Sequence, residues 1–91
     1  MADLEALDLV VHGRVQGVFF RAHVRAEAAR RGVAGRAVNR DDGTVAVHIE
    51  GPREAVAAVA AACRTGPEHS RVDLVEESVG EVEGLAGFAT G

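Results

Sequence analysis

The sequence is poor in the residues that build disulfides, metal clusters and aromatic surfaces. Cys63 is the only cysteine among 91 residues, so no disulfide can form within the chain and no cysteine cluster can hold a metal. There are three phenylalanines and neither tryptophan nor tyrosine, which argues against an RNA-binding sheet of stacked aromatic rings. With 10 basic and 14 acidic residues the net charge is −4, whereas nucleic-acid binding needs a basic surface. We therefore expect no nucleic-acid partner.

Long apolar runs are missing as well. No stretch approaches the roughly 20 apolar residues of a membrane-spanning helix. The segment from Met1 to Asp8 carries acids and lacks the apolar centre of a signal peptide. We expect a cytoplasmic protein with no membrane partner. A chain of 91 residues predicts a single domain, residues 1–91, and a monomer is the default expectation.

Hydrophobic periodicity predicts the first half of the fold. Residues 1–5 are expected to be irregular, and an alternating pattern from residue 7 predicts a strand with one buried face. Helix formers dominate residues 21–31, and Gly32 is suited to end that helix. The residues expected to face the core are Leu7, Leu9 and Val11 in the strand, and Phe20, Val24 and Ala28 in the helix.

The second half of the chain is predicted in the same way. Residues 35–40 form a short strand, and Asp41-Asp42-Gly43 predicts a hairpin turn with positive φ angles at the Asp-Gly pair. A second helix is expected from Pro52, in its first turn, to Gly66-Pro67. Alternation at Val45, Val47 and Ile49 predicts the next strand, and Val56, Val59, Ala60 and Cys63 form an apolar stripe on the second helix. Val72, Leu74 and Val79 indicate a fourth strand with weaker alternation, and Phe88 is expected to anchor a short final strand.

The order strand, helix, strand, strand, helix, strand is that of the ferredoxin-like βαββαβ fold. This fold is an α+β two-layer sandwich. We expect two amphipathic helices to cover one face of an antiparallel sheet.

The loop between the first strand and the first helix has the features of an anion site. Gly13 and Gly17 allow sharp turns and close approach to a ligand. The start of the helix presents unpaired N–H groups, and Arg21 adds a planar fork of five donors. The alternative is that the loop is only a connection. It lacks the Gly-Lys-Ser/Thr ending of a nucleotide P-loop, so a small phosphate is the expected anion.

Two segments resemble the acylphosphatase family. Gly-Arg-Val-Gln-Gly-Val-Phe-Phe-Arg at 13–21 is similar to the family's Gly-x-Val-Gln-Gly-Val-x-Phe-Arg signature. Gly-Arg-Ala-Val-Asn at 35–39, followed by Asp42-Gly43 and Val45, resembles the Gly-Trp-Val-x-Asn…Asp-Gly-x-Val block. Arg36 and Ala37 depart from the family pattern, which usually has Trp and Val there. The short, weakly apolar end of the chain raises the question of whether the last edge strand forms.

The resemblance implies an enzyme that hydrolyses acyl phosphates to a carboxylate and inorganic phosphate, with no metal or other cofactor. The partner would be a small-molecule acyl phosphate, and inorganic phosphate would be product and inhibitor. Arg21 would be the catalytic arginine and Asn39 would hold the attacking water. The residues implied to bind the phosphate through their backbone N–H groups are Val15, Gln16, Gly17, Val18, Phe19 and Phe20.

Other functions stay open at this point. The same loop could serve a non-catalytic module that binds phosphate or carboxylate. An RNA-binding or metal-carrying ferredoxin-like protein is disfavoured by the acidic charge, the few aromatics and the absence of a Cys-x-x-Cys pair. The histidines are expected to be solvated, although His12 and His48 could lie near each other on the open face of the sheet. Asp42 is expected to serve the turn and not catalysis.

Overall fold

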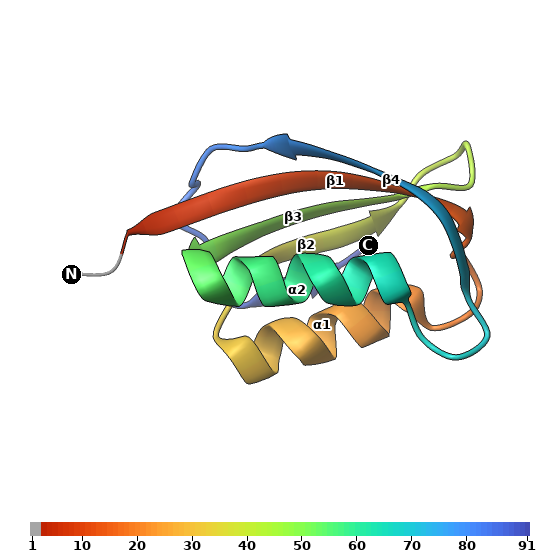
Figure 1. Ribbon diagram of the computed structural model, residues 1–91, viewed down its shortest axis with the longest axis horizontal. Coiled ribbons are helices and arrows are strands. Elements are labelled where there is room, and N and C mark those ends of the chain that lie inside the picture. The colour runs from red at the N-terminus through yellow and green to blue at the C-terminus, as the bar shows by residue number, and fades with distance from the viewer. Residues whose placement is uncertain (1–2) are drawn as a thin grey trace.

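The computed structural model describes residues 3–91, which form five strands and two helices (Figure 1). In chain order they are β1 (Leu4–Arg14), α1 (Phe20–Arg31), β2 (Ala34–Asn39), β3 (Val45–Pro52), α2 (Arg53–Thr65), β4 (Arg71–Val79) and β5 (Phe88–Thr90). Both helices lie on one face of the sheet, as expected for the ferredoxin-like α+β sandwich (Figure 1). Within residues 3–91, no helix is long and apolar enough to cross a membrane.

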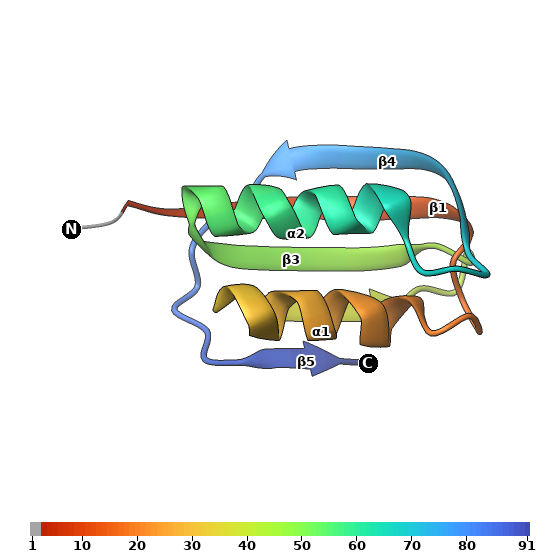
Figure 2. The ribbon, with the colours of Figure 1, turned by 60° about the horizontal axis from the view of Figure 1, so that its bottom comes forward.

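The sheet has the strand order β4-β1-β3-β2-β5. β4, β1, β3 and β2 are antiparallel neighbours, as predicted, but β5 pairs with β2 in parallel. The expectation of a wholly antiparallel sheet was therefore wrong for the last strand. β4 ends at the same end of the sheet at which β2 begins, and residues 80–87 cross that end (Figure 2). β5 consequently enters beside the start of β2 and runs in the same direction, with Gly35 opposite Phe88.

The core between the sheet and the helices is built from small apolar residues. Each helix buries the stripe that its spacing predicts: Phe20, Val24 and Ala28 in α1, and Val56, Val59, Ala60 and Cys63 in α2. They pack against Leu9 and Val11 of β1 and against Val45, Val47 and Ile49 of β3. Full burial of one valine stabilises the fold by about 1.5–3 kcal/mol. Burial also raises the pKa of the Cys63 thiol to about 12, so this cysteine stays protonated.

The start of β1 was predicted wrongly, and β4 forms as expected but without simple alternation. β1 starts at Leu4, so residues 4 and 5 are already paired with β3. In β4 the half-buried residues are Val72 and Val75, whereas Leu74 and Val79 are exposed. The register between β1 and β4 shifts after His12, where Asp73 is the extra residue. Such a bulge lengthens the inward spacing from two residues to three, which simple alternation does not anticipate.

The hairpin between β2 and β3 forms where it was predicted but with a different turn. Only Gly43 has a positive φ, of 90°, whereas Asp42 does not. The N–H of Gly43 donates to the Arg40 carbonyl at 3.1 Å, and the turn is followed by this left-handed glycine. Asp42 Oδ1 accepts from the hydroxyl of Thr44 at 2.6 Å and from its N–H at 3.0 Å, and these bonds lower the pKa of Asp42. Asp42 is a turn residue, as expected.

The two residues of β2 that depart from the family pattern, Arg36 and Ala37, both fit into the fold. Ala37 is fully buried in the core. Arg36, one residue earlier, points to the other face because side chains alternate along a strand. There it forms a two-pronged ion pair with Glu83, with N···O distances of 2.9 and 3.0 Å. This pair fastens β2 to the segment that leads into β5.

Candidate active site

The loop from residue 15 to residue 19 turns the chain from β1 into α1 through two left-handed residues. Gly17 has φ 73° and Phe19, the residue that caps α1, has φ 63°. The left-handed conformation costs a non-glycine residue roughly 1–2 kcal/mol, and the Phe19 side chain is 84% exposed, so burial does not offset it. Within residues 3–91, the N–H groups of residues 16–19 have no protein hydrogen-bond acceptor. They are free to bind an anion.

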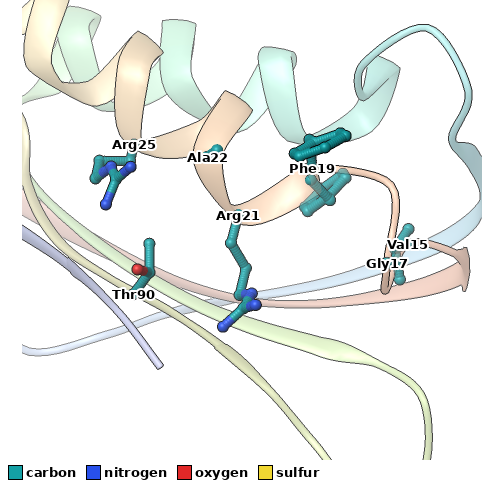
Figure 3. A pocket seen from close by; sticks show the side chains of 8 residues that line it. Val15, Gly17, Phe19, Arg21, Ala22, Arg25 and Thr90 are labelled. Atoms are coloured by element: carbon teal, nitrogen blue, oxygen red, sulfur yellow. The ribbon is translucent and has the colours of Figure 1, made fainter.

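A cavity of about 280 Å³ opens in front of this loop. Its lining contains two arginines and no acidic side chain (Figure 3). The lining residues are Val15, Gly17, Phe19, Phe20, Arg21, Ala22, Arg25 and Thr90. No side chain caps α1, so the N–H groups of its first turn stay unpaired beside the loop. Unpaired N–H donors and two guanidinium groups, with no acidic side chain in the lining, make this a site for an anion.

Four of the six predicted phosphate-binding residues line the cavity, and Gln16 and Val18 do not. Val18 packs into the core instead. The Gln16 side chain turns away and donates from Nε2 to the carbonyls of Arg40 and Thr44, at 2.8 and 2.9 Å. It therefore ties the loop to the hairpin that follows Asn39. The predictions for backbone N–H groups at these positions stay predictions.

The side chain of Arg21 and the backbone N–H of Asn39, the two residues predicted to be catalytic, donate to the same oxygen atom. Arg21 donates from Nη1 to the main-chain oxygen of Gly91 at 2.6 Å. The Asn39 N–H donates to the same oxygen at 3.0 Å. Gly91 is held in turn by its own N–H, which donates to the Ala37 carbonyl at 3.0 Å. Sequence reasoning missed this contribution of the β5 segment, because only the parallel pairing of β5 with β2 reveals it.

The Asn39 side chain has an unusual oxygen. Asn39 is two residues after the buried Ala37 and therefore points to the helix-covered face of the sheet. Its Oδ1 is buried and has no hydrogen-bond partner within residues 3–91. An unpaired buried acceptor costs about 1–3 kcal/mol, so such an atom calls for an explanation. A water molecule or ligand that donates to Oδ1 would provide one.

The expectation that the histidines are solvated was wrong for His48, which is only 4% exposed. Its ring lies between two carboxylates: Nδ1 is 2.7 Å from Asp8 Oδ1, and Nε2 is 2.7 Å from Glu50 Oε2. A ring that donates to both carboxylates carries a proton on each nitrogen, so this arrangement favours the positively charged form. Burial opposes that charge, but the hydrogen bonds to Glu50 and Asp8 outweigh it and raise the pKa of His48.

Glu50 anchors the segment that leads to β5. It is buried and accepts from the N–H groups of Glu83 and Leu85 at 2.9 and 2.7 Å. Burial alone would raise the pKa of Glu50, but the Glu83 amide, His48 and the Leu85 amide together lower it to about 2. His12 has a different partner, Glu76, so His12 and His48 do not form one cluster. Among residues 3–91, no group of three or more His, Cys, Asp or Glu side chains could hold a metal ion.

The fold and the site define a ferredoxin-like protein with an anion site at its first strand–helix loop. The family model for acylphosphatase matches residues 7–90. The chain is 53% identical over 75 residues to an acylphosphatase of Azorhizobium caulinodans, covering 82% of this chain and 81% of the relative. It is 48% identical over 83 residues to one of Nocardioides, covering 91% and 84%.

A solved structure agrees with these sequence matches. The crystal structure of acylphosphatase from Bacillus subtilis superposes with a TM-score of 0.91 at 37% identity, and the match covers 98% of this chain and 99% of the other. The chain belongs to the acylphosphatase family of enzymes, which confirms the resemblance carried by residues 13–21 and 35–45.

Proposed function

We propose that this protein hydrolyses the carboxyl-phosphate bond of acyl phosphates to a carboxylate and inorganic phosphate without a metal. The loop N–H groups and Arg21 bind the phosphoryl oxygens, where charge redistributes during phosphoryl transfer. Arg21 has five donors, so its bond to Gly91 leaves others for the substrate. The bond to Gly91 fixes the guanidinium before the substrate arrives.

In this proposal Asn39 orients the attacking water. Its unpaired Oδ1 accepts a hydrogen bond from that water. The water oxygen bonds to phosphorus, and the bond from phosphorus to the carboxylate oxygen breaks, with its electron pair leaving on the carboxylate. A proton of the water passes to a phosphate oxygen, because a neutral amide is too weak a base to take it. The carboxylate is a good leaving group, so no general acid is required.

The proposal also covers the product, the oligomeric state and the location of the enzyme. Inorganic phosphate is the product and competes with substrate for the loop. We also propose that the monomer is the active form. We propose a cytoplasmic location for the enzyme.

The observation that carries the proposal is that the Arg21 side chain and the backbone N–H of Asn39 donate to the same Gly91 oxygen, beside a loop with free N–H groups. The test is hydrolysis of benzoyl phosphate by the purified protein in the presence of EDTA. We expect turnover that survives the chelator and competitive inhibition by inorganic phosphate. Folded protein that binds phosphate without turnover would support the binding-module alternative and overturn the proposal.

A further inference from the structure

Arg25 is a second cation in the cavity that holds Arg21. It follows Arg21 by four residues, so the two lie on the same side of α1. Figure 3 shows both side chains extending from the helix toward the strand that carries Thr90, with Arg21 between Gly17 and Arg25. An anion bound by the loop and Arg21 therefore has Arg25 on the side away from the loop.

Arg25 has no partner among residues 3–91: its guanidinium makes neither an ion pair nor a hydrogen bond there. The other two arginines further along α1 behave differently. Arg30 and Arg31 pair with Glu27, at N···O distances of 3.3 and 2.9 Å. Like charges four residues apart repel each other and destabilise a helix. Two anionic groups, one at each arginine, would remove this repulsion.

The surroundings of Arg25 favour a substrate that extends along α1. Besides the cavity in front of the loop, Arg25 lines a second cavity of about 550 Å³. That second cavity contains no acidic side chain and is lined mainly by small or apolar residues: Ala28, Ala29, Gly32, Val33, Ala34, Leu85, Gly87 and Phe88. Arg25 is thus the charged group that an acyl chain leaving the phosphate loop would reach.

We propose that Arg25 determines specificity by binding a second anionic group on the acyl part of the substrate. The substrate class would be acyl phosphates whose acyl group carries a carboxylate or a phosphate. A guanidinium fork matches either group. The rise of about 6 Å over the four residues from Arg21 to Arg25 sets the scale of the spacing between the phosphoryl group and this second anion. The inference rests on the proposed hydrolysis and names the substrates that the site prefers.

The experiment compares rigid substrates that differ only in charge. 4-Carboxybenzoyl phosphate is paired with 4-methylbenzoyl phosphate, and the 3-substituted isomers form a second pair, so that two distances are sampled. The readout is the ratio of kcat/KM for the carboxylate to that for its methyl counterpart. This ratio is measured for the unmodified protein, for Arg25→Gln and for Arg30→Gln, the last being a control with the same change of charge on the same helix.

We expect the unmodified protein to favour at least one carboxylate, and Arg25→Gln to lower that ratio about fivefold, as for a charge pair worth about 1 kcal/mol. Arg30→Gln should keep the ratio, and added salt should reduce it in the unmodified protein. Equal ratios in the unmodified protein and Arg25→Gln, for both pairs, would overturn the assignment. If the methyl substrates themselves are not hydrolysed, it is the proposed function that fails.

Discussion

The main-chain oxygen of Gly91 accepts one hydrogen bond from the Arg21 side chain, at 2.6 Å, and another from the backbone N–H of Asn39, at 3.0 Å. Two residues from different elements, a helix and a strand, are thereby held at one atom. The strand β5 lies beside β2 only because its segment crosses the end of the sheet. The geometry of the site therefore depends on the last residues described as much as on the loop at 13–21.

Replacing Arg21 by lysine tests whether the planar guanidinium group is needed. Arg21→Lys keeps the positive charge but loses the planar arrangement of donors. We expect kcat/KM for benzoyl phosphate to fall about 100-fold or more, which is the scale for losing a preorganised donor. Inhibition by phosphate should weaken at least tenfold. Arg30→Lys on the same helix is the control, and a variant Arg21→Lys as active as that control would contradict the role assigned to the guanidinium.

Replacing Asn39 by alanine separates water orientation from phosphate binding. Asn39→Ala should lower kcat about 100-fold while leaving the inhibition constant of phosphate within about threefold. Because Oδ1 has no protein partner within residues 3–91, the free energy of unfolding should fall by less than about 1 kcal/mol. Steady-state kinetics and urea unfolding measure the two quantities. Undiminished kcat in a folded variant would exclude Asn39 as the residue that positions water.

Much of the fold could be predicted because most elements obey one simple period. The stripe on α2 is correct in all four residues, since a regular helix keeps its spacing from end to end. The alternation of β4 could not be predicted in the same way, because the bulge at Asp73 interrupts it. The parallel pairing of β5 could not be predicted, since it depends on where the chain crosses the sheet and not on local pattern.

The site also combines residues that a local motif reveals with contacts that no local pattern reveals. Arg21 and Asn39 stand in recognisable motifs, and the structure brings them to one oxygen atom. The role of Gly91 and the contacts of the Gln16 side chain join residues far apart in sequence and leave no local signal. His48 was mistaken for a surface residue because the segment containing Glu83, 35 positions later, covers it.

The bridge made by Gln16 predicts a stability effect. Its Nε2 donates to the carbonyls of Arg40 and Thr44 and joins the phosphate-binding loop to the hairpin. Gln16→Met removes both bonds at similar volume, and we expect the free energy of unfolding to fall by about 1–2 kcal/mol. Gln16→Glu turns the donor into an acceptor facing two carbonyls and should lose at least as much. Urea unfolding measures this free energy. An unchanged free energy of unfolding in both variants would show that the bridge does not stabilise the loop.

The pair of His48 and Glu50 predicts how stability depends on pH. The folded pKa of His48 is raised above its usual 6.5. Its contribution is therefore complete below about pH 6.5 and is lost as the pH rises through the folded pKa. The pKa of Glu50 is lowered to about 2, so its contribution is present above the ordinary pKa of 4.5 and is lost as the pH falls toward 2.

Chemical unfolding between pH 3 and pH 9 tests this pH dependence. We expect the decline of the unfolding free energy as the pH rises above about 6.5 to disappear in His48→Gln. The exposed His69 supplies the control, since His69→Gln should keep that decline. Equal pH profiles for His48→Gln and the unmodified protein would contradict the charged pairing of His48 with Asp8 and Glu50.

The central claim is that water attacks the phosphorus of a phosphoryl group held by the loop and Arg21. It is tested most directly by hydrolysing benzoyl phosphate in water enriched in oxygen-18, with EDTA present, and analysing both products by mass spectrometry. Attack at phosphorus places one labelled oxygen in the inorganic phosphate and none in the benzoate, which is the result we predict. Label in the benzoate would mean attack at the carbonyl carbon and would contradict the account.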